Sequence, residues 1–434
     1  MISTLFCWDK SENVAFVSMS DLDYYFALQE YFSWGNTVSK NIGIIGYQNH
    51  AFGIGSATKD MSICLEEQSF GVEKFVYEEF KEIVMLKDLK NHKLPSGELD
   101  LLISAVTTIH ATKLPQSSFN EIAPPYIAYW WWELEDLPEY FLKNAEFFDE
   151  IWAPTTFIYN NLKKALGTKV ALAPLTLRFN WETEGFTRTD FQLPEDVPIF
   201  LVRFDFNSTI DRKNPYAAID AFKNAFGTQT EAYLLVKTVN GENNLHLLEE
   251  LISIVEDRSD IRVWDEKLTR AINNDLMKCV TGYLSLHRAE GLGLNILEAM
   301  QAKVPVVTTG YGGNMDFCTS ENSFLISFKL VPVEDRSYLY PPLGVWAEPE
   351  IEEAARAIRS IVNGGEEIKQ KIEAGWEKVN AINKSKDFAG FVEKKIEEHK
   401  IKKRYSQNKE SIPIKSNSYA KSLIIKSRNY LKLK

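Results

Sequence analysis

The sequence predicts an α/β protein made of two doubly wound parallel sheets, each covered by helices on both faces. The first observation is the length of 434 residues, which corresponds to roughly two domains of about 100–200 residues each. Short apolar runs alternate with helical segments over most of the chain, which is typical of parallel strands buried on both faces. A polar, proline-containing stretch near residues 180–196 divides these runs into two series.

The first series forms the predicted N-terminal domain, residues 39–185. Before it, residues 1–38 are rich in aromatic side chains and are interpreted as an N-terminal extension. Buried strands are expected at residues 42–47, 101–105, 126–130 and 150–153. After the first of these strands, the glycines Gly53 and Gly55 lead into a helical stretch.

The second series forms the predicted C-terminal domain, residues 195–385, and residues 386–434 add a helix and a basic tail. Strands are expected at residues 199–202, 232–236, 261–263, 282–286 and 304–308. Open α/β sheets bind their ligands at the carboxyl ends of the strands. Two such domains that face each other are therefore expected to leave a ligand-binding cleft between them.

The composition excludes several classes of protein. Hydrophobic residues make up 45% of the chain and charged residues 25%, which is typical of a globular protein and not of a disordered one. No stretch approaches the roughly 18 apolar residues of a membrane-spanning helix, and the N-terminus lacks the pattern of a secretory signal. The four cysteines are too dispersed for a disulfide framework or a structural zinc site. We therefore expect a cytoplasmic protein.

The net charge of -11 is unevenly distributed along the chain. The segment Lys400–Lys434 has eleven basic residues and one acidic residue, Glu410, so it carries +10 and the rest of the chain about -21. An acidic body disfavours non-specific nucleic-acid binding, whereas the tail suits an anionic surface. Residues 422–431 are compatible with a basic amphipathic helix at the inner face of a membrane, and a disordered tail is the alternative.

One segment joins a strand, a glycine turn and the start of a helix. The strand ends at Leu286, and the helix begins near Leu294 after the turn Gly291-Leu292-Gly293. Glycines let backbone N–H groups approach a ligand closely, and the start of a helix adds a partial positive charge. The segment therefore predicts an anion-binding site.

Two glutamates flank this predicted anion site. Glu290 precedes the turn, and Glu298 lies one helical turn inside the helix. Both can accept hydrogen bonds from hydroxyl groups of a ligand whose phosphates lie on the backbone amides. A ligand with hydroxyls at both ends and phosphates between them is a nucleotide sugar. The alternative is an acidic loop followed by a surface glutamate, which a lone Gly-x-Gly would favour and the whole segment does not.

This segment resembles the retaining glycosyltransferases of family 4, which have the GT-B fold of two Rossmann-like domains facing across a cleft. Their mark is Glu-x7-Glu after a strand, followed by Ala-Met, a short polar spacer and Pro-Val. This chain has Glu290, Glu298, Ala299-Met300, Gln301-Ala302-Lys303, Pro305-Val306-Val307 and Gly310-Tyr311-Gly312-Gly313-Asn314. The resemblance covers residues 40–400 as architecture and residues 200–350 closely.

The resemblance implies a role for each part of the segment. Glu290 contacts the transferred sugar, Glu298 contacts the nucleotide ribose, and the backbones of Gly291–Leu294 and Gly310–Gly313 frame the site. It also implies front-face transfer with retention, in which the leaving phosphate assists the incoming hydroxyl. No metal or other cofactor is expected, and the acceptor is a glycan or glycoconjugate, with lipid-linked acceptors common among the relatives.

A basic pair follows the first strand of the second domain. Asn214 is expected as the N-cap of a helix and Pro215 as its first residue, so Arg212 and Lys213 stand at a helix N-terminus. Two cations and a helix dipole suit a diphosphate leaving group. The resemblance implies the family's basic pair at this place. Arg203 is an alternative to Arg212, because the loop is longer than usual, and a solvated surface pair is the structural alternative.

Further candidates each have a structural alternative. Gly53 and Gly55 resemble the glycine loop under the donor phosphates, or form a bare turn. His110 lies roughly where the family often places a residue near the transferred sugar, and a structural histidine is the alternative. Lys237, at a strand end, faces the phosphates or the solvent.

Three consecutive tryptophans, Trp130-Trp131-Trp132, precede Glu133 and Glu135. Aromatic faces beside hydrogen-bond acceptors suit sugar rings, so this stretch is a candidate lining of the acceptor side. Consecutive residues cannot all face one way, and at least one tryptophan is therefore expected in the core. The Asp21-Leu22-Asp23 triplet has the form of a metal-binding motif of another glycosyltransferase fold, but no strand precedes it and chance explains it better.

Two other functions stay open for this sequence. A GT-B epimerase or phosphorylase would need a pyridoxal-phosphate lysine or extra acid/base carboxylates, for which the sequence offers no candidate. A non-catalytic scaffold or regulatory subunit would typically have lost Glu290, Glu298 or the basic pair, and all of them are present.

Overall fold

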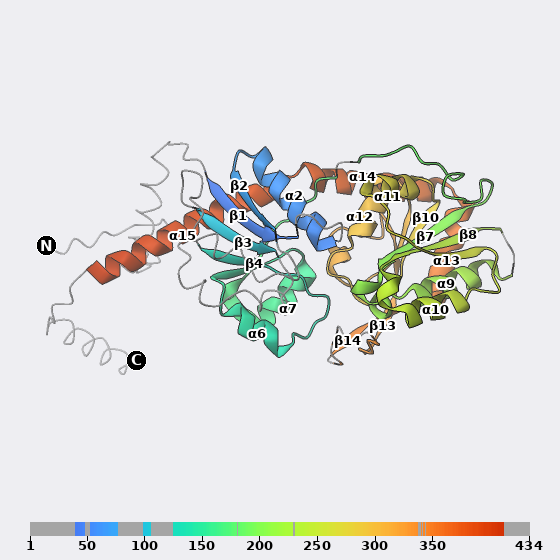
Figure 1. The fold of residues 1–434 in the computed structure, drawn as a ribbon, viewed down its shortest axis with the longest axis horizontal. Coiled ribbons are helices and arrows are strands. Elements are labelled where there is room, and N and C mark those ends of the chain that lie inside the picture. The colour runs from blue at the N-terminus through green and yellow to red at the C-terminus, as the bar shows by residue number, and fades with distance from the viewer. Residues whose placement is uncertain are drawn as a thin grey trace, which may run out of the picture. The chain divides into compact units, whose positions relative to one another are not determined.

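The computed structural model describes residues 40–47, 53–76, 99–105, 125–179, 181–228, 231–336, 340, 342 and 344–411. Residues 39–391 form one compact unit, which contains two six-stranded sheets (Figure 1). The first sheet has the order β2-β1-β3-β4-β5-β6, and all of its strands are parallel. Its strands are β1 (Asn41–Gly46), β2 (Gly71–Val76), β3 (Leu101–Ala105), β4 (Tyr126–Tyr129), β5 (Glu150–Ala153) and β6 (Val170–Leu172).

The second sheet has the order β12-β11-β10-β7-β8-β9 and is also parallel throughout. Its strands are β7 (Ile199–Asp205), β8 (Tyr233–Val239), β9 (Ile261–Asp265), β10 (Gly282–Ser285), β11 (Val306–Thr309) and β12 (Phe324–Ile326). The chain winds from β7 outward to β9, and then returns to place β10 on the other side of β7. The strand order therefore reverses between β7 and β10, which is where open α/β sheets bind ligands.

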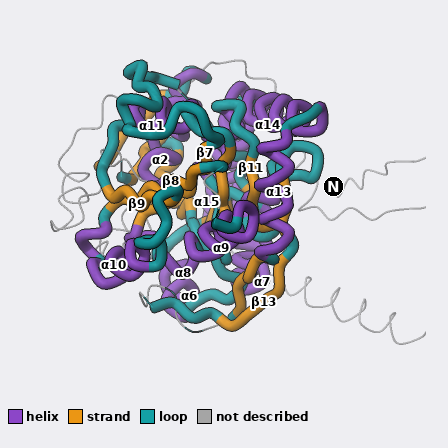
Figure 2. Tube along the Cα trace, turned by 90° about the vertical axis from the view of Figure 1, so that its right-hand side faces the viewer, coloured by secondary structure: helices purple, strands orange, loops and turns teal. Residues whose placement is uncertain are grey.

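Helices cover the sheets because the strands are apolar on both faces. The helices are α2 (Gly53–Glu67), α6 (Glu139–Ala145), α7 (Thr156–Leu166), α8 (Ile210–Lys213), α9 (Pro215–Phe226), α10 (Leu245–Ser253), α11 (Arg270–Lys278), α12 (Leu294–Gln301), α13 (Ile351–Asn363), α14 (Glu366–Lys384) and α15 (Asp387–Ser411). Along β7, Phe200 and Val202 pack in one core with α9 and α13, which lie side by side in Figure 2. Ile199 and Leu201 alternate with them and pack in another core with α11 and α12. This alternation confirms that the sheet is buried on both faces.

The predicted α/β architecture of two parallel sheets is confirmed. Each of the nine strands expected from the sequence is present, with ends that differ by a few residues. Residues 173–198, around the predicted linker, contain no helix or strand in their described part. The domain boundaries at residues 39–185 and 195–385 stay predictions.

A two-stranded antiparallel hairpin was not expected from the sequence. It consists of β13 (Phe328–Pro332) and β14 (Val345–Pro349) and lies in the chain between β12 and α13. We call the part of the chain that forms the first sheet the first half, and the part from β7 onward the second half. The same apolar cluster contains Val333, Tyr340 and Trp346 of the second half and Trp130 and Trp132 of the first half. The hairpin therefore links a segment of the second half to the core of the first.

Several predictions lie outside the described residues. They are the N-terminal extension at residues 1–38 with Asp21 and Asp23, the candidate His110, and the tail from residue 412 onward. None of the helices in the described part of the chain is long and apolar enough to cross a membrane.

Candidate functional site

The candidate site lies where the strand order of the second sheet reverses. Arg203 lies near the carboxyl end of β7, and α8 with Arg212 and Lys213 follows that strand. Glu290 and the glycine turn follow the neighbouring strand β10. The two connections run side by side, because the N–H group of Arg288 donates to the carbonyl oxygen of Arg212 over 2.8 Å.

The basic pair is held by a sharp turn between two helices. Asn214 adopts a left-handed conformation with φ of 49°, ends α8 and caps α9. Its side chain accepts a hydrogen bond from the N–H group of Ala217, and Pro215 is the first residue of α9. The predicted N-cap and first helical residue are therefore confirmed. Arg212 and Lys213 lie just before this cap, in the short α8.

Both cations of the pair face Glu290. Lys213 Nζ lies 2.5 Å from Glu290 Oε2, and Arg212 Nη1 lies 3.7 Å from the same oxygen. All three side chains are largely buried, with exposed fractions of 18%, 4% and 12% for Lys213, Arg212 and Glu290. Burial would raise the pKa of Glu290, but Lys213 and Arg212 lower it to about 2. Glu290 is therefore ionised at neutral pH.

Arg212 is held in place by the backbone as well as by charge. Its Nη1 donates to the carbonyl oxygen of Ala289 over 2.8 Å, and its Nε donates to that of Ser208. Burial alone would lower the pKa of Arg212, but Tyr340 and the carboxylates of Glu133 and Glu290 raise it. The guanidinium is thus a fixed positive charge in a buried environment.

A second ion pair joins Arg203 and Glu298. Arg203 Nη2 donates to Glu298 Oε2 and, over 2.6 Å, to Asn295 Oδ1, while Asn295 Nδ2 donates back to the carbonyl oxygen of Arg203. Burial lowers the pKa of Arg203. Of the two candidates for the partner of Lys213, the structure brings Arg212 to Glu290, and it places Arg203 with the other glutamate.

Glycines shape the backbone around Glu290. Gly293 has φ of 93° and precedes the first residue of α12, whose N-terminus has no side-chain cap. Gly312 has φ of 107°, and the N–H group of Gly313 donates to the carbonyl oxygen of Glu290 over 2.7 Å. A Cβ on Gly313 would lie 1.8 Å from the carbonyl oxygen of Gly291, so only glycine fits. The predicted framing glycines thus lie against one another. Of the two leucines of the turn, Leu292 is buried and Leu294 is half-buried.

His287 connects the end of β10 to the segment Gly310–Gly313, and it was not a candidate site residue in the sequence. Its Nε2 lies 2.9 Å from the carbonyl oxygen of Tyr311, and its Nδ1 lies 3.0 Å from the hydroxyl of Ser285. A carbonyl oxygen only accepts, so Nε2 carries the hydrogen and Nδ1 accepts from Ser285. Burial lowers the pKa of His287 to about 4, and the ring is neutral at neutral pH.

The remaining sequence candidates lie in different surroundings. Lys237 is buried, and its Nζ donates to the carbonyl oxygens of Thr238, over 2.8 Å, and of Glu266. Burial lowers the pKa of Lys237 to about 8. Gly53 and Gly55 form the first turn of α2.

The tryptophan stretch divides as the sequence predicted. Trp130 and Trp132 are buried in the core of the first half, whereas Trp131 is half-buried. Glu133 and Glu135 extend from the loop that follows β4. Their hydrogen-bond donors are two tyrosines of the second half, Tyr340 and Tyr311 respectively.

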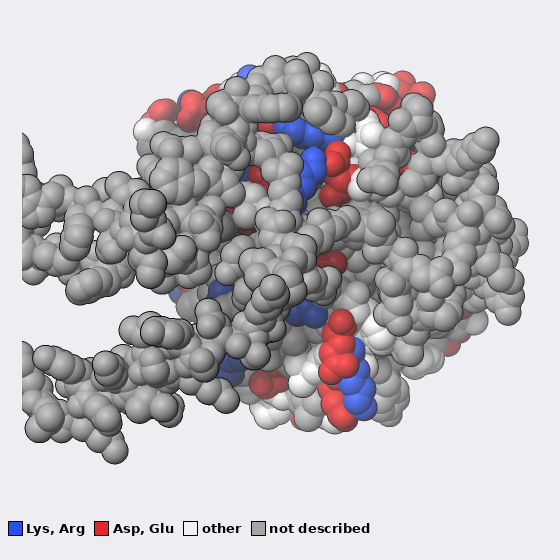
Figure 3. All heavy atoms as spheres, turned by 90° about the vertical axis from the view of Figure 1, so that its left-hand side faces the viewer, with Lys and Arg blue, Asp and Glu red and all other residues white. Residues whose placement is uncertain are grey.

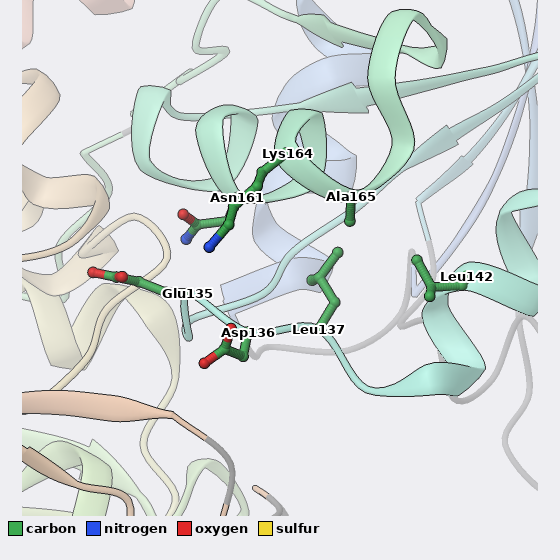
Figure 4. Close-up of a pocket in the computed structure, with 7 residues that line it drawn as sticks. All are labelled: Glu135, Asp136, Leu137, Leu142, Asn161, Lys164 and Ala165. Atoms are coloured by element: carbon green, nitrogen blue, oxygen red, sulfur yellow. The ribbon is translucent and has the colours of Figure 1, made fainter.

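A pocket of about 220 Å³ continues from this loop (Figure 4). It lies between the loop after β4 and the helices α6 and α7. Its lining residues are Glu135, Asp136, Leu137, Leu142, Asn161, Lys164 and Ala165. The lining combines apolar side chains with charged and amide groups.

The histidine, cysteine and acidic side chains of the described residues bear on metal binding, and one face of the molecule shows how its charges are distributed. Among the described residues, no group of three or more histidine, cysteine, aspartate or glutamate side chains could hold a metal ion. On the face drawn in Figure 3, the described acidic and basic side chains are interspersed.

A family model described as "Glycosyl transferases group 1" matches residues 208–378, and no curated protein matched the chain. Anabaena HepE in complex with UDP and glucose has a similar fold, with a TM-score of 0.56, 15% identity, and coverage of 83% of this chain and 99% of that chain. Sucrose-phosphate synthase from Thermosynechococcus elongatus gives a TM-score of 0.59, 13% identity and coverage of 83% and 99%. A glycosyltransferase from Rickettsia africae gives 0.57, 12%, 84% and 99%.

At these identities the structural likeness shows the fold alone. The family model matches by sequence and covers residues 208–378, which lie in the second half of the chain. The matched residues include Arg212, Lys213, Glu290 and Glu298. Arg203, the ion-pair partner of Glu298, precedes the matched range. The match supports a glycosyltransferase. The chain therefore has the GT-B fold, and residues 208–378, which carry the cluster of Arg212, Lys213 and Glu290, match the model of the group 1 glycosyl transferases.

Proposed function

We propose that the protein transfers a sugar from a nucleotide-sugar donor to a hydroxyl group of a glycan or glycoconjugate. The observation that carries the proposal is the buried cluster of Arg212, Lys213 and Glu290 beside a glycine turn and the N-terminus of α12. This cluster lies at the strand-order reversal of a sheet, where a phosphate-bearing ligand is expected.

In this proposal the basic pair acts on the departing diphosphate. Negative charge grows on that group as the glycosidic bond breaks, and two fixed cations in a buried environment stabilise it. Lys213 is bound to Glu290, so an arriving diphosphate competes for the ammonium group with a carboxylate 2.5 Å away. Glu290 would then be released to orient hydroxyl groups of the transferred sugar.

The second ion pair would bind the ribose of the donor. Glu298 lies in α12, and Arg203 holds one of its carboxylate oxygens. A ribose has two adjacent hydroxyl groups, and a carboxylate held in this way can accept a hydrogen bond from each of them. Arg203 is in this view a residue that positions Glu298.

We propose a retaining reaction of the family 4 type that uses no metal ion. The acceptor oxygen forms a bond to the anomeric carbon while the bond from that carbon to the diphosphate oxygen breaks. Both events occur on one face of the sugar, and the acceptor proton passes to the diphosphate oxygen. Arg212 and Lys213 supply the countercharge that a metal supplies in other enzymes.

Thermal-shift measurements with nucleotide sugars test the proposal. The wild-type protein is expected to be stabilised by at least one of UDP-glucose, UDP-galactose, UDP-N-acetylglucosamine, GDP-mannose, dTDP-glucose and ADP-glucose. Glu298→Ala should weaken that stabilisation, whereas Lys303→Ala, which removes an exposed pair with Glu373, should not. A wild-type protein that responds to none of the donors would support a scaffold role instead.

We also propose that the basic tail contacts an anionic membrane near a lipid-linked acceptor. The support is the charge of +10 over Lys400–Lys434, at about 1 kcal/mol per basic residue near such a surface. Removing residues 405–434 should abolish sedimentation with phosphatidylserine-containing vesicles. Equal sedimentation of the shortened protein would contradict the role of the tail.

A further inference from the structure

A tyrosine in the connection between β13 and β14 lies beside the charged cluster. Tyr340 follows β13, is 4% exposed, and donates from its hydroxyl to Glu133 Oε2 over 2.6 Å. Its ring lies 5.8 Å from the guanidinium of Arg212 and 5.2 Å from the ring of Trp132. Its own N–H group donates to Asp335 Oδ2 over 2.9 Å. Tyr340 is thus held on several sides while its hydroxyl holds Glu133.

Two hydrogen bonds that do not involve Tyr340 also hold the backbone of the loop that bears Glu133. The indole N–H of Trp132 donates to the carbonyl oxygen of Asp136 over 2.9 Å. Asn161 of α7 donates to the carbonyl oxygen of Leu134 over 3.2 Å. The backbone on both sides of Glu133 is therefore anchored, and among the described residues Tyr340 is the hydrogen-bond donor to its carboxylate.

One oxygen of Glu133 remains for a ligand. Oε2 accepts from Tyr340, and among the described residues no hydrogen bond to Oε1 is present. A Cβ built on Gly291 would lie 3.7 Å from Oε1, so this oxygen faces the glycine turn beside Glu290. Glu133 is only half-buried, which leaves room for a polar group to approach. A carboxylate held by one oxygen and open at the other is suited to accept a hydrogen bond from a hydroxyl.

We propose that Glu133 binds the incoming hydroxyl group, and that Tyr340 is the residue that positions Glu133. This inference rests on the proposed function. The donor groups are assigned to elements of the second half, whereas Glu133 approaches Gly291 from the first half. The same loop continues to Glu135 and Asp136, which line the pocket of about 220 Å³. The remainder of a polyhydroxylated acceptor would extend along this loop.

Hydrolysis of the donor tests the role without knowledge of the natural acceptor, because water then takes the place of the incoming hydroxyl. The probe is the nucleotide sugar that gives the largest thermal shift with the wild-type protein. Glu133→Ala should slow release of the nucleoside diphosphate by about tenfold or more, while the donor Kd stays within about twofold. Glu133→Gln keeps the shape of the side chain, and its hydrolysis rate should lie between those of the wild-type protein and Glu133→Ala. This second variant preserves the test if the alanine variant does not fold.

The positioning role of Tyr340 has its own measurement. Tyr340→Phe removes only the hydroxyl and should slow hydrolysis less than Glu133→Ala does. Combined with Glu133→Ala, it should add no further loss, because a positioning residue acts through the residue it positions. Tyr216→Phe is the matched control: it removes a tyrosine hydroxyl that donates to Glu250 and accepts from Arg336, and it should leave the rate unchanged.

Three results would overturn the inference and one would overturn its premise. Unchanged hydrolysis in both Glu133 variants, with donor binding intact, excludes a role for Glu133. A donor Kd weakened by the same factor as the rate assigns Glu133 to the donor instead of the hydroxyl. Additive losses in the double variant exclude positioning by Tyr340. A wild-type protein that binds no nucleotide sugar overturns the proposed function itself.

Discussion

The two glutamates of the site have different basic partners although only seven residues separate them. Glu290 precedes α12 and lies in the loop beside α8, so it meets Lys213 and Arg212. Glu298 lies inside α12 and meets Arg203 at the end of β7. The sequence singled out both glutamates because they flank the glycine turn. It left Arg203 and Arg212 as alternatives, because the course of the long loop after β7 depends on tertiary contacts.

Replacing Lys213 tests whether this lysine stabilises the negative charge of the leaving diphosphate. Lys213→Ala should reduce donor turnover on the order of 100-fold, because one of two cations near the departing diphosphate is lost. The melting temperature should change less than the activity does. Lys303→Ala is the control, since it removes a lysine–glutamate pair that is about half exposed. Steady-state release of the nucleoside diphosphate measures the effect, and equal turnover would show that the diphosphate lies elsewhere.

Glu290 makes the stability of the protein depend on acid pH. Its pKa is about 2 in the folded protein and 4.5 as the reference value, so the folded state favours the ionised form. Its contribution to stability is therefore complete above pH 4.5 and is lost as the pH falls toward 2. Wild-type protein should exceed Glu290→Gln in melting temperature at pH 7, and the difference should shrink below pH 4.5. A difference that grows on acidification would mean that the ion pair does not lower this pKa.

At the level of elements, the sequence predicted what local chemistry controls. The N-cap Asn214, the proline after it and the alternation of strands and helices follow from backbone geometry and apolar patterning. The hairpin of β13 and β14 was missed, because Leu330 and Lys329 are exposed and its pattern is not that of a buried strand. Tyr340 was missed with it, because the connection to Glu133 spans 207 residues of sequence.

The close contact between the two glycine turns predicts that Gly313 cannot be replaced without loss of stability, and a glycine of α15, Gly390, serves as a comparison. Gly313→Ala would place a Cβ against the carbonyl of Gly291, and it should destabilise the protein by more than about 2 kcal/mol and lower activity. Gly390→Ala in α15 meets no atom within 4 Å and should stabilise the protein by up to about 1 kcal/mol. Chemical denaturation of both variants measures the difference, and two changes of the same sign would contradict it.

The helix α2 carries a buried acid that gives a second pH dependence. Burial raises the pKa of Asp60 to about 6, although Arg270 and Arg178 oppose the shift. Its contribution to stability is complete below its reference pKa of 3.8 and is lost as the pH rises through about 6. The free energy of unfolding of Asp60→Asn should therefore rise relative to that of the wild-type protein, by on the order of 2 kcal/mol between pH 4 and 7.5. Thermal melts at these two pH values measure the gain, and a constant difference would contradict it.

At the scale of the whole molecule, the net charge of -11 says little about the anionic donor proposed here. The cations proposed to act on the donor lie near the end of β7 or in the connection that follows it. Arg203 is paired with Glu298, and Lys213 is paired with Glu290. The sequence predicted the two sheets because each strand is a short buried run. It could not show which residues of one half meet the other, since contacts such as Tyr311 with Glu135 depend on how the halves pack.

The most direct measurement of the central claim is release of nucleoside diphosphate from the six donors by wild-type protein and by Glu290→Gln. We predict that the wild-type protein turns over at least one donor. The variant should bind that donor with a Kd within a few-fold of the wild-type value and turn it over on the order of 100-fold more slowly. No release from any donor by the wild-type protein, or equal release by the variant, would contradict glycosyl transfer at this site.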